Sequence, residues 1–115
     1  MFSFKPDYAQ VKARIEAFWE GEIIDRPLAQ FAVPRPYEEW VPEPISGHAT
    51  PEERWLDAGY QAELALARCH NTLFMADALP IAWPNLGPEV FSAFYGCPLH
   101  FGDYGTSWTD PILHD

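Results

Sequence analysis

Three side chains stand where a small anionic ligand could bind: Arg35, Trp83 and Asn85. Each follows a short apolar segment that the sequence predicts as a strand, and α/β proteins bind ligands at the carboxyl ends of strands. The Arg35 guanidinium suits a carboxylate or phosphate. Trp83 would supply an aromatic wall, and the Asn85 amide can donate and accept hydrogen bonds. The alternatives are a solvated loop arginine, a core tryptophan and an asparagine that satisfies its own turn.

Asp77, Asp103 and His48 are the other titratable candidates. The two aspartates could act as acid–base carboxylates. A carboxylate near a strand start more often caps or pairs locally, and a histidine beside Gly47 in a polar loop is ordinary. The sequence therefore assigns no catalytic residue.

Cys69, His70, Cys97 and His100 are chemically a Cys2His2 set. Two residues separate the second pair, a spacing that can place both ligands on one zinc ion. The first pair is adjacent, so its side chains diverge at a helix end, and small buried thiols with surface imidazoles are the simpler interpretation. We therefore expect no metal. The sequence also has no phosphate-binding glycine loop and no nucleophile-elbow serine, and we expect no cofactor.

Short helices and strands must position these side chains. Apolar residues recur at helical steps between Tyr8 and Trp19, which predicts a helix ended by Gly21 in the left-handed conformation. A strand is predicted over residues 28–33. The proline-rich loop that follows, residues 34–49, has a length typical of functional or mobile loops.

The second half of the sequence predicts two more helices and two more extended segments. Thr50 can cap a helix that continues to about Cys69 or His70, with Pro51 in its first turn and Glu53 returning a bond to the cap. An extended segment follows over residues 72–83, then a helix over 88–96, a strand over 97–101 and a tail with a short extended piece. This alternation predicts an α/β fold.

The charge balance excludes several classes of partner. The 115 residues carry 7 basic and 17 acidic side chains, a net charge of −10, which repels nucleic-acid backbones and anionic membrane surfaces. No apolar run approaches the roughly 20 residues that span a bilayer, and the start does not resemble a signal peptide. Two cysteines fit a reducing compartment. We expect a cytoplasmic protein.

Aromatic residues make up 16% of this short chain, and 12 prolines punctuate it. Many large aromatics with few elements to cover them indicate surfaces that pack on something else. A second subunit or the rest of a larger fold could cover these aromatic surfaces.

Two segments of the chain resemble a known family. KPDYAQVKARIEAFWEGEIIDRPL and DALPIAWPNLGPEVFSAFYGCPLHFGDYGTSW are similar to the N-terminal region of uroporphyrinogen decarboxylase-like proteins, a superfamily that includes methyltransferases acting on corrinoid-bound methyl groups. The run WPNLGPEVFSAFYG is the more specific part. The resemblance covers nearly all of the chain but only about the first third of such a protein, whose fold is a (β/α)8 barrel of about 250 residues or more.

The resemblance implies roles for few residues. In the decarboxylases an arginine-rich motif after the first strand grips substrate carboxylates, and here only Arg35, between Pro34 and Pro36, matches it. An aspartate that binds pyrrole nitrogens would fall near Pro84 and Asn85, where the chain has none, which argues against porphyrinogen decarboxylation itself. The zinc ligands of the methyltransferases lie beyond the region matched.

The length implies an incomplete barrel. Two or three βα units cannot close eight strands, and an open piece leaves strand edges and an apolar sheet face in water. We therefore expect residues 1–115 to form one segment, the N-terminal helices and first two or three βα units of a partial (β/α)8 barrel, which contributes part of a pocket for a tetrapyrrole-like or corrinoid-linked anion without a complete active site. The alternative is a non-catalytic chain that folds by self-association as a homo-oligomer and acts as an interaction module.

Overall fold

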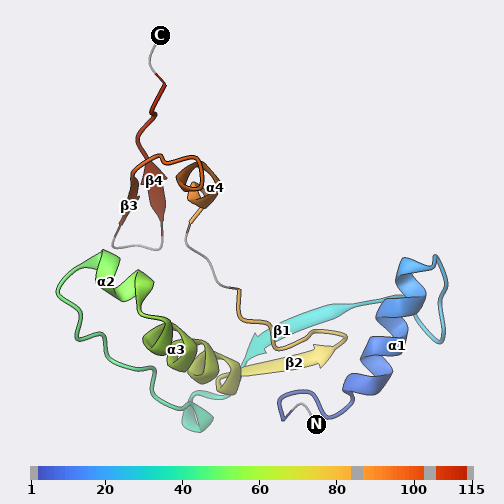
Figure 1. The fold of residues 1–115 in the computed structure, drawn as a ribbon. Helices are drawn as coiled ribbons and strands as arrows, with labels where there is room; N and C mark the ends of the chain where they lie inside the picture. Colours follow the sequence, from blue (N-terminus) through green and yellow to red (C-terminus); the bar gives the residue numbers. More distant parts are fainter. Residues whose placement is uncertain (1–2, 84–86, 103–105, 114–115) are drawn as a thin grey trace. The chain divides into compact units, whose positions relative to one another are not determined.

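The structure, a computed structural model, describes residues 3–83, 87–102 and 106–113 (Figure 1). Asn85 and Asp103 lie outside the described residues. The elements in chain order are α1 (Tyr8–Trp19), β1 (Gln30–Pro34), a 3-10 turn η1 (Tyr37–Glu39), α2 (Pro51–Leu56), α3 (Ala58–His70), β2 (Thr72–Ala76), α4 (Val90–Ala93), β3 (Leu99–Phe101) and β4 (Ser107–Thr109).

Contacts group the chain into two compact units. The first unit comprises Met1–Glu43 and Ala65–Ala82, and the second comprises Pro44–Leu64 and Trp83–Asp115. Helix α3 contributes its first half to the second unit and its second half to the first.

Helix α1 of the first unit forms where the apolar pattern predicts a helix, but only part of the predicted stripe is buried. Val11 is 0% exposed, whereas Phe18 and Trp19 are 52% and 80% exposed. The chain leaves the helix at Gly21, whose φ of 79° is the left-handed conformation predicted for it, which costs glycine little because it has no Cβ.

Strands β1 and β2 form the two-stranded sheet of the first unit (Figure 1). They pair antiparallel, with Phe31 opposite Met75 and Val33 opposite Leu73. Neighbouring strands of a (β/α)8 barrel run parallel. The described residues therefore show no barrel, and the partial barrel is unconfirmed. The mixture of helices and short strands confirms the α/β class.

The prediction of one helix over residues 50–70 is wrong in one respect, because the structure has two helices there, α2 and α3. Asp57 interrupts it with an extended backbone, ψ 96°. Its Oδ1 accepts a hydrogen bond from the Tyr60 N–H at 2.9 Å, so the side chain caps α3 and competes with helix continuation. The predicted end at His70 is confirmed.

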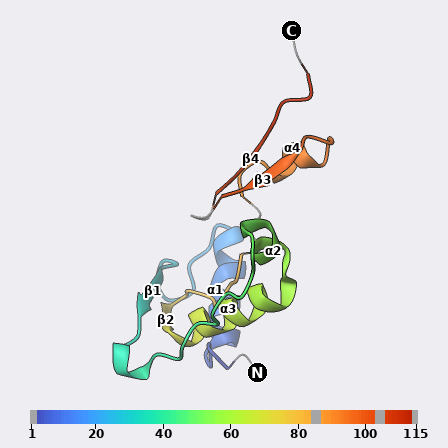
Figure 2. The same ribbon diagram turned by 90° about the vertical axis from the view of Figure 1, so that its left-hand side faces the viewer.

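The second unit contains a β3–β4 hairpin with the short helix α4 beside it (Figure 2). The Trp55 ring of α2 lies 5.5 Å from that of Phe101, and its Nε1 donates to the Gly102 carbonyl at 3.3 Å. Gly87 approaches the hairpin so closely that a Cβ there would fall 1.7 Å from Ser107 Oγ. Glycine is therefore required at this position.

The described residues bury few apolar side chains. Val11, Ala17, Ala67 and Ala78 form the core, and all four belong to the first unit. Among the described residues of the second unit no apolar side chain is fully buried. A stable domain of this size normally buries far more.

Within the described part of the chain, every helix falls short of the length and apolar character needed to cross a membrane.

Candidate functional site

Arg35 follows β1 directly, and its backbone is held on both sides. Its N–H donates to the Asn71 carbonyl at 2.9 Å. Its own carbonyl accepts from Trp40 Nε1 at 2.8 Å. The position of its Cα is thus fixed by the end of the sheet and by the loop that follows.

The Arg35 guanidinium is only loosely paired. Its Nη1 lies 3.5 Å from Glu39 Oε2, and the two side chains are 32% and 56% exposed. A pair this long and this solvated contributes little to stability. An anionic ligand could therefore take the place of Glu39 at small cost.

Two aromatic rings that the sequence analysis did not single out lie beside Arg35. Tyr37 is 81% exposed, and its ring centroid lies 5.4 Å from that of the half-exposed Trp40. Both occur in the proline-rich loop, whose length was the one signal that pointed to them. We call Arg35, Tyr37, Glu39 and Trp40 the Arg35 cluster.

Asn71 also holds the middle of this loop, at Val41. Its side-chain Oδ1 accepts from the Val41 N–H at 2.8 Å, and its Nδ2 donates to the Val41 carbonyl at 3.0 Å. This buried amide pairs with the loop as a neighbouring strand would. The Arg35 cluster is therefore closed at both ends by defined contacts.

Of the other two predicted ligand-binding residues, the structure describes Trp83 but not Asn85. Trp83 belongs to the second unit and is 81% exposed, so the core alternative for this ring does not apply. Asn85 lies outside the described residues. Of the predicted ligand-binding residues, Arg35 is thus the one that the described contacts hold in place.

Asp77 makes the densest polar contacts in the first unit. It is 0% exposed and receives Arg26 Nη1 at 2.5 Å, Arg26 Nη2 at 2.9 Å and Arg14 Nη1 at 3.3 Å. The Ala29 N–H adds a fourth donor at 3.0 Å. Arg14 also pairs with Asp25 through two bonds of 2.7 and 2.8 Å.

These donors decide what Asp77 can do. Hydrogen bonds from Arg26 lower the pKa of Asp77, so it stays ionised. Both of its oxygens are occupied by donors, which leaves no lone pair aimed at a substrate. Ion pairing therefore fits the geometry and general acid–base chemistry does not, although the arginines that pair with Asp77 are distant in the sequence and not local.

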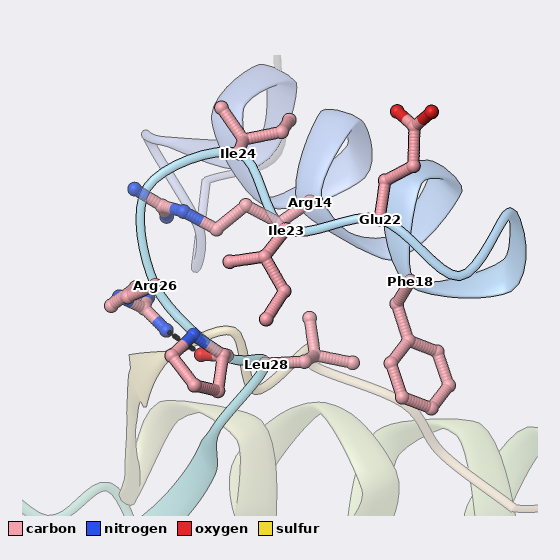
Figure 3. Close-up of a pocket in the computed structure, with 8 residues that line it drawn as sticks. Arg14, Phe18, Glu22, Ile23, Ile24, Arg26 and Leu28 are labelled. Atoms are coloured by element: carbon pink, nitrogen blue, oxygen red, sulfur yellow. Dashed lines mark hydrogen bonds between the residues drawn. The ribbon is translucent and has the colours of Figure 1, made fainter.

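A small hollow lies next to this ion pair in the first unit (Figure 3). Its volume is about 200 Å3. The side chains of Phe18, Ile23 and Leu28 line it, while the Glu22 carboxylate points away from it. Arg14 and Arg26 also line it, but both are paired with Asp77. The hollow therefore offers apolar surface and little unmatched positive charge.

His48 joins a chain of hydrogen bonds in the second unit. Its Nδ1 lies 3.0 Å from Ser46 Oγ and its Nε2 lies 2.9 Å from Asp57 Oδ2. The Tyr60 N–H and His48 together lower the pKa of Asp57. A serine nucleophile needs an enclosed, preorganised site, whereas Ser46 is exposed. The arrangement fits a tether between the loop and the start of α3.

The cysteines and histidines of the zinc alternative have other surroundings. The His70 ring packs edge-on against Phe4, and the His100 imidazole bonds Asp110 at 2.8 Å and stacks on Trp108. Burial raises the pKa of the Cys69 thiol. Across the described ranges, no three potential metal ligands come together.

Comparisons of this chain with protein-family models, with curated proteins and with solved structures gave no match.

Proposed function

We propose that the chain is the N-terminal portion of a uroporphyrinogen decarboxylase-like barrel protein and that the Arg35 cluster forms part of its pocket for an anionic ligand. The observation that carries this proposal is Arg35 itself, whose backbone is anchored while its guanidinium has one long contact with an exposed carboxylate. Such a group is available to a ligand without rearrangement of the chain.

The chemistry around Arg35 defines the class of ligand. A guanidinium binds carboxylates through paired N–H donors, and the neighbouring rings of Tyr37 and Trp40 offer flat apolar surface. A planar molecule with carboxylate side chains, such as a carboxylated tetrapyrrole, meets both demands. We propose binding without a complete catalytic set.

The apolar surface supports the incomplete barrel. Large side chains remain exposed in both units, among them Trp19, Ile23, Ile24, Ile45, Trp83, Phe94 and Leu113. The second unit has no fully buried apolar side chain among its described residues. Further protein surface is needed to cover these groups.

Titration with a tetracarboxylated porphyrin, followed by its fluorescence anisotropy, tests the binding proposal. Arg35→Ala should weaken binding about tenfold, the typical effect of losing a charge-assisted hydrogen bond. Arg68→Ala is the matched control, since Arg68 is an exposed arginine of the same unit paired with Glu43 at 3.3 Å. It should change affinity by less than about twofold, as expected for a surface pair.

A second variant should change porphyrin affinity in the opposite direction. Glu39→Gln removes the carboxylate that competes for Arg35 and should tighten porphyrin binding. Equal affinities for the Arg35 and Arg68 variants, with no gain from Glu39→Gln, would remove the Arg35 cluster from the ligand site.

The second candidate is a non-catalytic chain that completes its fold by self-association as an interaction module. Strand β1 favours it, because every one of its residues is exposed although the strand pairs with β2. Sedimentation velocity on this chain separates the candidates. A defined oligomer supports self-association, and heterogeneous aggregation supports a barrel segment that lacks its remaining strands.

A further inference from the structure

We propose that the outer edge of β1 pairs with β1 of a second copy of this chain, so that two sheets join into one continuous antiparallel sheet. This inference deepens the self-association candidate and rests on it. It names the surface that the copies use.

The register of the β1–β2 pair determines which backbone groups are left at the edge. Asp77 N–H donates to the Ala29 carbonyl at 2.7 Å, and Arg35 N–H donates to the Asn71 carbonyl at 2.9 Å. Hydrogen-bonded pairs alternate along an antiparallel ladder, so Phe31 and Val33 bond toward β2. The N–H and C=O groups of Gln30 and Ala32 therefore point away from β2.

The opposite edge of the sheet is already closed. The Lys5 ammonium, only 3% exposed, donates to the carbonyls of Phe74 and Ala76 at 3.1 and 2.6 Å. These are the outward-facing carbonyls of β2, by the same alternation. A bound lysine side chain blocks a partner strand there, which leaves β1 as the edge that can accept one.

Strand β1 lacks the features that usually prevent edge pairing. Natural edges carry charged side chains, bulges or internal prolines, whereas QFAVP contains no charge in a chain of net charge −10. Its one proline, Pro34, is the last residue. The Phe31 side chain, 58% exposed, adds apolar surface that a partner would cover.

The strand is complementary to itself in one register. Centred on Ala32, a two-fold antiparallel pair lets the two Ala32 residues exchange both hydrogen bonds, and each Gln30 N–H reaches a Pro34 carbonyl of the other copy. Pro34 needs no acceptor because it has no N–H. Phe31 of one copy then faces Val33 of the other, an aromatic and β-branched pair that stabilises sheets.

Ala32→Pro tests this edge selectively. It removes an N–H that points away from β2, so the β1–β2 ladder keeps its own bonds. Sedimentation equilibrium should show a dimer dissociation constant raised about tenfold or more by loss of the two central hydrogen bonds. Ala32→Val keeps the N–H and should leave the constant within about twofold, the effect of a minor surface change.

Amide hydrogen exchange in the wild-type chain gives a second readout that does not depend on how a variant folds. The Gln30 and Ala32 amides should be protected at high concentration and lose protection on dilution. The Phe31 and Val33 amides, bonded to β2, should stay protected at both concentrations.

The proposal is overturned if the Gln30 and Ala32 amides exchange freely where the chain is associated, since association would then use another surface. A chain that stays monomeric at its highest soluble concentration would overturn both this inference and the self-association candidate. Porphyrin binding through Arg35 has its own readout, so its failure is distinguishable from either result.

Discussion

At the residue scale, Asp77 shows how one side chain can hold several segments together. Its carboxylate joins Arg14 of α1, Arg26 before β1 and the backbone of Ala29. A buried charge is tolerated only when it is paired and hydrogen-bonded. The sequence marks Asp77 as a candidate for pairing but does not say with which cations, because those lie 51 and 63 residues away.

Asp77→Asn should destabilise the first unit strongly. The amide keeps the shape of the carboxylate but leaves two guanidiniums without their shared counter-charge, a change that costs about 3 kcal/mol in buried pairs. Urea denaturation followed by circular dichroism measures the loss. Asp25→Asn is the control, since Asp25 is half-exposed and its loss should matter far less. Equal losses for the two variants would contradict a special role for the buried carboxylate.

Acidification should destabilise the same cluster. The Arg14 guanidinium lowers the pKa of Asp25 to about 2 from its usual 3.8, and the pKa of Asp77 is also lowered. A depressed pKa in the folded chain means that the stability contribution is complete above 3.8 and is lost as the pH falls toward 2. The urea midpoint should fall over this range. A midpoint that stays constant between these pH values would show that the carboxylates are not paired.

At the element scale, the start of α2 confirms a prediction in detail. Glu53 N–H donates to Thr50 Oγ1 at 3.2 Å, with Pro51 in the first turn. The Glu53 carboxylate returns a bond, although to the N–H of Ala49 at 2.9 Å and not to that of Thr50. Local sequence decides such caps because all their atoms lie within a few residues.

Thr50→Ala should destabilise α2 by about 1 kcal/mol, because the Glu53 amide loses its acceptor. The chain should also lose some helical signal near 222 nm in circular dichroism. Thr50→Ser keeps the hydroxyl and should remain close to wild type. If serine and alanine behaved alike, the cap would contribute nothing.

At the scale of the whole molecule, apolar content and burial do not match. Hydrophobic residues make up 48% of the sequence, yet the described core is one valine and three alanines. Net stability is a small difference between burial and chain entropy, so a chain with this little burial needs more covered surface. Association with further protein would provide it, against the repulsion of ten net negative charges on each copy.

Salt should therefore strengthen self-association at neutral pH. Raising ionic strength from about 0.1 to 1 M shortens the screening length from about 10 to 3 Å, which weakens the repulsion between copies while the uncharged β1 edge is unaffected. Sedimentation at the two salt concentrations measures the change. Weaker association in high salt would mean that ion pairs, and not an uncharged edge, hold the copies together.

The sequence by itself determined the local features of this protein. The left-handed Gly21 just after α1, the end of α3 at His70, the Thr50 cap and the α/β class were all predictable. Hydrophobic periodicity, capping residues and glycine act over a few positions. The break at Asp57 is also local. It was missed because the apolar pattern continues through it, while one side chain captures the backbone of the next turn.

Only the tertiary structure decided what lies beside what. The antiparallel pairing of β1 with β2, the arginines around Asp77 and the lysine that closes one sheet edge all join residues far apart in the chain. Ala76 even adopts a positive φ of 53°, which alanine rarely takes. Such contacts depend on long-range geometry that no local pattern encodes. Around Arg35 the bond to Asn71 is of this kind, whereas Tyr37, Glu39 and Trp40 lie within five residues of it.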